Sequence, residues 1–472
     1  MLILLMNDIV AFMIYYKSVL SSLRIEDIER FIGITSYVTG HEGIGGVIKM
    51  RSEDFLVWEV LETGLDAKKL FESSSFVGDF GNYILCVLKK VGVDSIRAVS
   101  LLASRLSIRS KEIGICGIKD KMSVSWQFIT IPSSITEKIL EDGKTISVGN
   151  LIEVKPIRWF QHRLSSRLLR NNVFRVRIRN PKTTDVQKVE EIIKELRGKG
   201  VPNYFGHQRF GITRPITPVV GRLILKRRLG EAVAAFLSDY SNLENEKNRL
   251  VRKELGEGWD LGRAIEIFPK SLVYERRMIE SLIKNPGDYV KCLRTLPLRL
   301  RRLIVESVGA RIFNLALSEI IKEDRLNEIE VGDIVLPVDS SGRADKNRPI
   351  TVTSRNIKQV EKLVKDEKMV NALPILGYLS PIPRSSKGEI ILEIMEKEEI
   401  DLKDFMIVDM PEASTKGSLR PVIITKWSCS VLSVDDESFT LEFSLPPGSY
   451  ATILLREIMK SENPLSYIGR HS

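Results

Sequence analysis

The chain has 472 residues, of which 43% are hydrophobic and 28% are charged. This composition excludes wholesale disorder, and the length indicates two or three domains. Lysine and arginine exceed aspartate and glutamate by 10 (71 against 61), which favours a polyanionic partner.

The cysteines and histidines are scattered along the chain, with no CxxC pair and no histidine pair at metal-ligand spacing. We therefore expect neither a disulfide framework nor a zinc site, and a reducing cytoplasm is the expected compartment. The residues concerned are Cys86, Cys116, Cys292, Cys429, His41, His162, His207 and His471.

The first 20 residues are strongly apolar, but Asn7 and Asp8 interrupt them. They lack a basic beginning, a small-residue cleavage pattern and the unbroken length of a membrane span. We expect an amphipathic or buried helix here, or upstream sequence before a start at Met6 or Met13, and no membrane association.

A helix, two strands and a charged turn are predicted between residues 94 and 131. Asp94 can cap a helix whose apolar positions include Val99, Leu102 and Leu106. Residues 112–116 read as a short apolar strand, and residues 125–131 alternate as a half-buried strand does. The connection between the strands carries Asp120, whose carboxylate should project into solvent or a cleft.

Asp120 is the candidate catalytic residue. Lys119 and Lys121 flank it, and positive charges nearby favour the ionised carboxylate. An ionised carboxylate on a rigid turn is what a carboxylate nucleophile requires. The alternative is a solvated charged turn, because lysine and aspartate are common in turns.

Residues 173–198 predict a strand followed by a helix. Phe174, Val176 and Ile178 share one face of the strand, and three arginines occupy the other. A capping box at Thr184 and Gln187 should begin the helix, and Gly198 should end it. Strands mixed with capped helices indicate an α+β protein.

The segment 201–214 is rich in aromatic residues, amides and arginine. Its aromatic rings could stack on RNA bases, and its amides and arginines could bind base edges or phosphates. The alternative is a packing elbow between two domains, which its glycines fit equally well. The candidate residues are Tyr204, Phe205, Phe210, Gln208, Arg209 and Arg214.

After residue 214 the pattern becomes charged and helical. Basic clusters occur at residues 226–228 and at Arg299, Arg301 and Arg302, and such clusters are usually solvated helix faces. Strands return at 421–424 and 439–445, and a helix follows near 450–460.

Several segments together resemble the TruD family of tRNA pseudouridine synthases. The first is Gly117-x-Lys119-Asp120-Lys121 with Gln127, similar to the family's catalytic motif, and the second is Asn203-Tyr204-Phe205-Gly206-x-Gln208-Arg209-Phe210-Gly211. The others are Lys49 with Ser52-Glu53-Asp54-Phe55-x-Val57-x-Glu59, Asn171-Asn172-Val173-Phe174, and Ser444 to Thr452 with Arg456-Glu457. Asn171 departs from the glycine usual in the family.

The resemblance implies an α+β fold with a mixed, mostly antiparallel sheet core split by a large inserted α/β domain. We expect residues 1–202 and 411–472 to form the catalytic core and residues 203–410 to form the insertion. The tRNA cleft should lie at their junction, near residues 204–209.

The resemblance also implies isomerisation of a tRNA uridine, usually at position 13, with Asp120 as the catalytic carboxylate. Lys49 would supply positive charge beside it, Asn172 would orient Asp120 or the base, and Phe174 would stack on the uracil. Phe55 could contact the base, although core packing competes for both phenylalanines. The reaction oxidises nothing, so neither a metal nor an organic cofactor is expected. We expect a cytoplasmic monomer with tRNA as its partner.

Two other functions fit parts of the pattern. A carboxylate-dependent glycosidase would pair Asp120 with Glu59 or Glu53 and release free base or sugar. A non-catalytic RNA-binding protein would tolerate replacement of Asp120.

Overall fold

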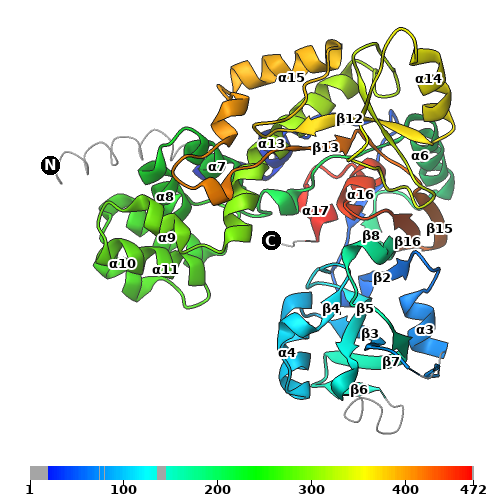
Figure 1. Cartoon of the computed structure of the whole chain (residues 1–472), viewed down its shortest axis with the longest axis horizontal. Helices are drawn as coiled ribbons and strands as arrows, with labels where there is room; N and C mark the ends of the chain where they lie inside the picture. The colour runs from blue at the N-terminus through cyan, green and yellow to red at the C-terminus, as the bar shows by residue number, and fades with distance from the viewer. Residues whose placement is uncertain (1–19, 74, 79, 136–144, 470–472) are drawn as a thin grey trace.

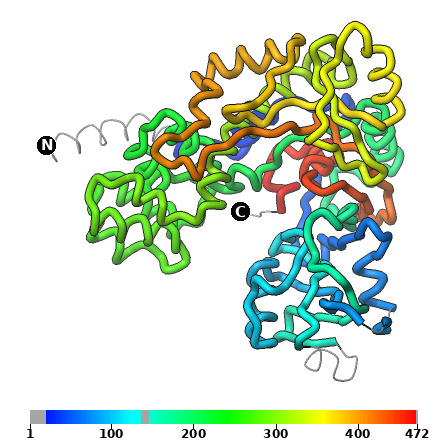
Figure 2. Tube along the Cα trace, in the orientation of Figure 1, coloured from blue at the N-terminus to red at the C-terminus, as the bar shows by residue number. Residues whose placement is uncertain are grey.

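The computed structural model describes residues 20–73, 75–78, 80–135 and 145–469. Residues 1–19 of the expected amphipathic segment therefore lie outside the described residues, and so does His471. The chain forms two regions, drawn in Figures 1 and 2. Strands from both ends of the chain, blue to cyan and brown to red, build the first region, and the green to orange middle of the chain builds the second.

The first region is a 10-stranded mixed sheet in the order β15-β16-β8-β2-β5-β3-β7-β6, with β1 added to β8 and β4 to β5. Only β2 and β5 pair in parallel among its described strands. The expected α+β fold with a mostly antiparallel sheet is confirmed. The strands are β1 (Gly45–Val47), β2 (Phe55–Leu61), β3 (Tyr83–Val91), β4 (Gly114–Ile115), β5 (Val124–Pro132), β6 (Ile146–Val148), β7 (Ile152–Phe160), β8 (Leu169–Pro181), β15 (Ser428–Asp435) and β16 (Ser438–Leu445).

Strand β5 is the centre of this sheet and is buried on both faces, so the expectation of a half-buried strand was wrong. Its Ile129 and Ile131 pack with the apolar face of α4 (Ser95–Leu106). Its Trp126 and Phe128 belong to a second cluster, on the side of α3 (Ala67–Ser73). Strand β4 is shorter than expected, because residues 110–112 form a 3-10 turn.

Helix ends agree only in part with the sequence patterns. The Asp94 cap is confirmed, since its carboxylate accepts a hydrogen bond from the Arg97 N–H. Helix α6 (Val186–Lys199) is capped by Asp185, which accepts from the Gln187 N–H at 2.9 Å, so the expected cap at Thr184 was wrong. The helix ends at Gly200, whose φ of 86° suits glycine, rather than at residue 198.

The second region is mainly helical and contains a four-stranded sheet in the order β11-β10-β12-β13. The 25-residue helix α13 lies at the centre of this region and packs against α7 and β12. The elements are α7 (Thr217–Leu225), α8 (Leu229–Ser238), α9 (Glu246–Gly258), α10 (Leu261–Ile267), α11 (Val273–Lys284), α12 (Tyr289–Arg294), α13 (Leu298–Lys322), β10 (Ile334–Pro337), β11 (Ile350–Thr351), α14 (Ile357–Lys365), β12 (Met369–Ile375), α15 (Ser386–Lys397) and β13 (Ser418–Pro421).

The strands after residue 411 divide between the two regions. Strand β13 pairs with β12, β14 (Ile423–Ile424) pairs with β9 (Val201–Pro202), and β15 and β16 join the large sheet. The pairing of β13 favours a change of domain after residue 421 rather than at 411. The three-part division of the chain stays a prediction.

Both ends of the described chain meet beside the large sheet. The Ile44 N–H donates to the Ile458 carbonyl in α16 (Ala451–Met459), and the Ile48 N–H donates to the Ser466 carbonyl in α17 (Leu465–Ile468). These contacts hold the segment that precedes β2, and thus Lys49, against the C-terminal helices.

Candidate active site

Asp120 lies on the connection between β4 and β5, and its side chain is 47% exposed. Its backbone is held from behind: its carbonyl accepts hydrogen bonds from Lys90 Nζ at 2.7 Å and Ser123 Oγ at 2.9 Å. Burial lowers the pKa of Lys90 to about 8, with the charge of Asp120 acting in the opposite direction. The loop is therefore fixed while the carboxylate stays accessible.

Lys49 is the cation that pairs with Asp120. Its Nζ lies 2.9 Å from Asp120 Oδ2, and its side chain is 4% exposed. The same ammonium lies 4.3 Å from the centre of the Phe55 ring. The contact is a charge-assisted hydrogen bond, which holds the carboxylate in place beside a buried positive charge.

Lys119 does not face Asp120, contrary to the expectation from the sequence. Its ammonium points inward to Glu59, with Nζ 2.6 Å from Oε1, and both side chains are buried. Glu59 also accepts a hydrogen bond from the Phe128 N–H at 2.8 Å. The pair therefore anchors the catalytic loop to β2 and β5, and Glu59 is closed to a substrate.

Asp120 opens into a pocket of about 410 Å³. Phe174 forms part of its wall, stacked on Phe443 with ring centres 5.1 Å apart and meeting Phe55 edge-on at 5.9 Å. Asp120 is the one carboxylate among the described lining residues. These residues are Phe55, Val57, Cys116, Gly117, Ile118, Lys119, Asp120, Ser166, Leu169, Asn172, Phe174, Gln208 and 447–452.

Two amides complete the pocket. Asn172 lies on β8 beside Phe174, and its Oδ1 hydrogen-bonds to no described residue. Gln208, from the second region of the chain, is exposed at the pocket edge. The structure thus brings Lys49, Phe55, Asn172, Phe174 and Gln208 to Asp120.

Most of the aromatic rings in the segment 201–214 are not available to RNA. Tyr204 and Phe210 are fully buried, and Phe205 is 7% exposed. The Tyr204 hydroxyl lies 2.9 Å from Ser318 Oγ, and the Phe205 N–H donates to Asn314 Oδ1, both on α13. The interpretation as base-stacking rings is corrected, and the alternative of a packing elbow holds.

The arginines of this segment are also engaged within the protein. Arg209 makes an ion pair with Glu306 at 2.9 Å and is largely buried. Arg214 donates to the carbonyls of Asp239, Ala235 and Phe236. Arg209 thus links the segment to α13.

The basic clusters are largely paired with carboxylates. Lys226 lies 2.9 Å from Asp404 and Arg227 lies 3.0 Å from Asp409. Arg301 is buried and pairs with Glu412. These cations stabilise contacts between helices and loops, whereas the sequence pattern predicted solvated helix faces.

Some residues around the pocket were not predicted from the sequence. Lys90 is a fully buried lysine on a strand, and no local pattern indicates its bond to the catalytic loop. The motif from Ser444 to Thr452 is visible in the sequence, but its residue types alone indicate no role in the pocket. Arg420 lies behind the loop 447–450 of this motif and donates to the Gly448 carbonyl at 3.3 Å.

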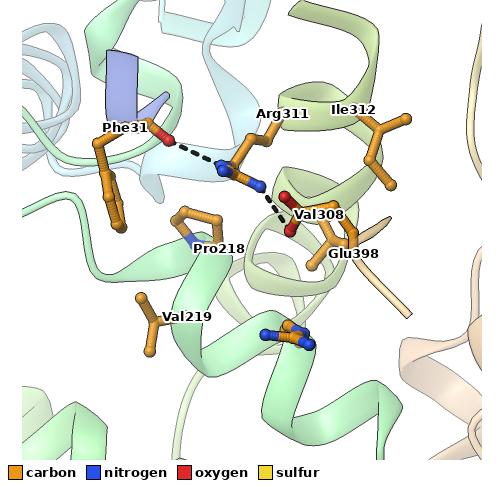
Figure 3. Close-up of a pocket in the computed structure, with 8 residues that line it drawn as sticks. Phe31, Pro218, Val219, Val308, Arg311, Ile312 and Glu398 are labelled. Carbon is orange, nitrogen blue, oxygen red and sulfur yellow. Dashed lines mark hydrogen bonds and ion pairs between the residues drawn. The ribbon is translucent and has the colours of Figure 1, made fainter. Parts of the chain in front are cut away.

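A smaller hollow of about 160 Å³ lies elsewhere, between α7 and α13 (Figure 3). Its carboxylate, Glu398, lies 2.7 Å from Arg311, whose Nε donates to the Phe31 carbonyl. The rest of its wall is apolar apart from Arg222, which pairs with Glu399 at 2.9 Å. With these charges paired, the hollow offers no reactive group.

No cluster of three potential metal ligands occurs in the part of the chain that the structure describes. Within the same residues, no helix is long and apolar enough to cross a membrane.

The fold and the pocket together indicate a candidate enzyme site, in which one half-exposed carboxylate lies in a pocket whose aromatic walls suit a flat ring. The volume lies within the range of about 300–1,000 Å³ usual for small-molecule sites.

Comparison with known proteins gives the class of enzyme. The model of the family "tRNA pseudouridine synthase D (TruD)" matches residues 31–458. The chain is 34% identical to a probable tRNA pseudouridine synthase D of Thermococcus onnurineus, over 92% of this chain and 99% of that protein. A similar protein of Methanococcoides burtonii is 32% identical, over 93% and 98%.

A solved structure agrees with these matches. The putative tRNA pseudouridine synthase D of Methanosarcina mazei superimposes with a TM-score of 0.76 at 30% identity, over 93% of this chain and 99% of that one. The chain belongs to the TruD family of tRNA pseudouridine synthases, which are isomerases that act on RNA. The glycosidase alternative is not favoured, because Glu59 is paired and buried and Glu53 does not line the pocket.

Proposed function

We propose that this protein isomerises uridine to pseudouridine in tRNA, at position 13 as is usual in the family, with Asp120 as the catalytic carboxylate. The observation that carries the proposal is the placement of Asp120. It is half-exposed, paired with the buried ammonium of Lys49, and alone among described carboxylates in an aromatic-walled pocket.

The reaction breaks the bond between C1′ and N1, turns the uracil, and joins C5 to C1′. N1 gains a proton, and C5 loses its hydrogen. Addition of a carboxylate to C1′ and removal of a sugar proton both require an ionised carboxylate beside the ribose, so one placement of Asp120 serves either route. The Lys49 ammonium donates a hydrogen bond to that carboxylate and places a positive charge beside it.

The aromatic wall has a separate task. The target uridine must leave its stack to reach the pocket, which costs a few kcal/mol. Stacking of the uracil on Phe174 offsets about 1–3 kcal/mol of this free energy. A uracil held against Phe174 also stays in the pocket while its glycosidic bond is broken, so free base is not lost. Asn172 and Gln208 supply amide groups for the base edge.

We further propose a cytoplasmic monomer in which residues 1–202 and the chain after β13 form the catalytic core, and the residues between them form the inserted domain. The pocket is lined by Asp120 from the catalytic core and by Gln208 from the inserted domain, so the tRNA would contact both domains.

The test is to incubate the purified protein with unmodified tRNA transcripts and to map pseudouridine at single-nucleotide resolution. The proposal expects one major site, at position 13. Modification only at another position would overturn the position, and an absence of pseudouridine in every tRNA would overturn the function.

A further inference from the structure

One wall of the pocket is formed by the loop 447–450 and the first turn of α16. The helix has nine residues, and the side chain at its N-cap, Tyr450, makes no capping hydrogen bond. The first N–H groups of a helix have no partner within it and carry the positive end of its dipole. An uncapped helix start at a pocket wall favours an anion.

Thr452 adds an independent observation at the same place. Its side chain is 97% buried, since only 3% is exposed, and it lines the pocket in the first turn of α16. Its hydroxyl has no hydrogen-bond partner among the described residues. Buried hydroxyls are almost always paired, so an exception on a pocket wall indicates a partner that comes with the substrate.

Arg420 supplies a buried positive charge behind this wall. Its guanidinium donates to neutral groups, namely the carbonyls of Asn203, Tyr204 and Gly448 and the Asn203 side chain, and it lies 4.1 Å from the Phe205 ring centre. In the described part of the chain no carboxylate pairs with it. Burial lowers its pKa to about 10, so it stays protonated at neutral pH. A buried charge without a counter-ion is costly, and an anion in the adjacent pocket would offset that cost.

We propose that the first turn of α16, the Thr452 hydroxyl and the Arg420 charge form a subsite for an RNA phosphate next to the target uridine. The subsite rests on the proposed function. Asp120 and the first turn of α16 line the same pocket, so a nucleotide with its ribose at Asp120 can place its phosphate at that wall. Because the phosphate stays attached to the ribose throughout, the subsite would hold the sugar still while the base turns.

The test begins with Thr452→Val, which removes the hydroxyl and keeps the shape. In the free protein this change should leave the melting temperature unchanged or raise it, because no hydrogen bond is lost. The KM for tRNA should rise about tenfold, since hydrogen bonds to charged groups are the stronger ones. Thr452→Ser, which keeps a hydroxyl, should restore most of the affinity.

Thr425 offers a matched control. It is also buried, but its hydroxyl donates to the Gly342 carbonyl at 2.7 Å. Thr425→Val should therefore lower the melting temperature. A Thr452→Val variant that loses stability as Thr425→Val does, with an unchanged KM, would overturn the proposal.

A second arm changes the RNA. An oligonucleotide substrate with a neutral methylphosphonate on the 5′ or the 3′ side of the target uridine removes a single charge. Wild-type protein should lose about tenfold in kcat/KM at one of the two positions, and Thr452→Val should lose little more there, because both changes remove one contact. Equal kcat/KM for both modified RNAs and the unmodified RNA would overturn the subsite. Failure of the proposed function is distinct, since the wild-type protein would then form no pseudouridine in the unmodified RNA.

Discussion

The buried pair of Lys119 and Glu59 gives a prediction in which burial, rather than distance, decides the energy. The two groups lie 2.6 Å apart with side chains 7% and 0% exposed. On the same sheet Lys89 and Glu153 are also 2.6 Å apart, but with side chains 30% and 42% exposed. The two pairs are matched in geometry and differ in contact with water.

Lys119→Met leaves the Glu59 carboxylate buried without a counter-ion. Breaking a buried pair from one side costs about 3–5 kcal/mol of the free energy of unfolding. A unit of 150–250 residues shifts its melting temperature by about 2–4 °C per kcal/mol, so a drop of about 10 °C is expected. Lys89→Met should cost under about 1 kcal/mol, as exposed pairs do.

The double variant Glu59→Gln with Lys119→Met removes both charges and keeps an oxygen for the Phe128 N–H. It should regain most of the loss, which gives a coupling energy of about 3 kcal/mol in a double-mutant cycle. Thermal unfolding followed by tryptophan fluorescence measures the wild type, Lys119→Met, Glu59→Gln and the double variant, with Lys89→Met as the exposed control. A cost below about 1 kcal/mol for Lys119→Met, or equal costs for Lys119→Met and Lys89→Met, would refute the argument.

Three further predictions concern pH, stacking and salt. Burial lowers the pKa of His207 from 6.5 to about 4, so the unfolded chain takes up a proton first as the pH falls. Unfolding free energy should then fall by up to about 3 kcal/mol between pH 6.5 and 4, beyond any fall in His207→Leu. Parallel pH curves for the two proteins would contradict this. Phe174→Leu, which keeps volume but loses the ring, should lower kcat/KM for tRNA about tenfold through weaker stacking, and an unchanged value would remove Phe174 from the base site. The affinity for tRNA should fall steeply as salt rises, and a flat plot of log affinity against log salt would argue against phosphate contacts.

The arrangement of the pocket was predictable from the sequence where the motifs fall on one loop or strand. Asp120 follows from its turn between strands. Asn172 was expected on the opposite face of the strand from Phe174, but the two residues are two positions apart on β8 and both line the pocket. The sequence separation between Lys49 and Asp120 is bridged only in the fold, so their pairing came from the family resemblance rather than from spacing.

Other expectations failed because the partner lies far away in the chain. The direction of Lys119 depends on Glu59, 60 residues earlier. Tyr204 and Phe205 have the chemistry of base-binding rings, but α13 covers them from more than 100 residues later. Strand β5 alternates in sequence and is still buried on both faces, because separate apolar clusters cover the two sides of the sheet. The local sequence pattern of a strand does not show which distant elements will cover it.

The central claim is that the Asp120 carboxylate takes part in breaking and forming bonds. Asp120→Asn is isosteric but has neither the charge nor comparable nucleophilicity. Asp120→Asn takes the counter-ion from the buried Lys49 ammonium and should therefore lower the free energy of unfolding, but the asparagine oxygen can still accept from Lys49. The fold and the affinity for tRNA should therefore be retained. The measurement is tritium release from tRNA labelled at uridine C5, since forming the new carbon–carbon bond expels that hydrogen. Folded Asp120→Asn protein that still binds tRNA should release no tritium, and release at close to the wild-type rate would show that Asp120 is not the catalytic carboxylate.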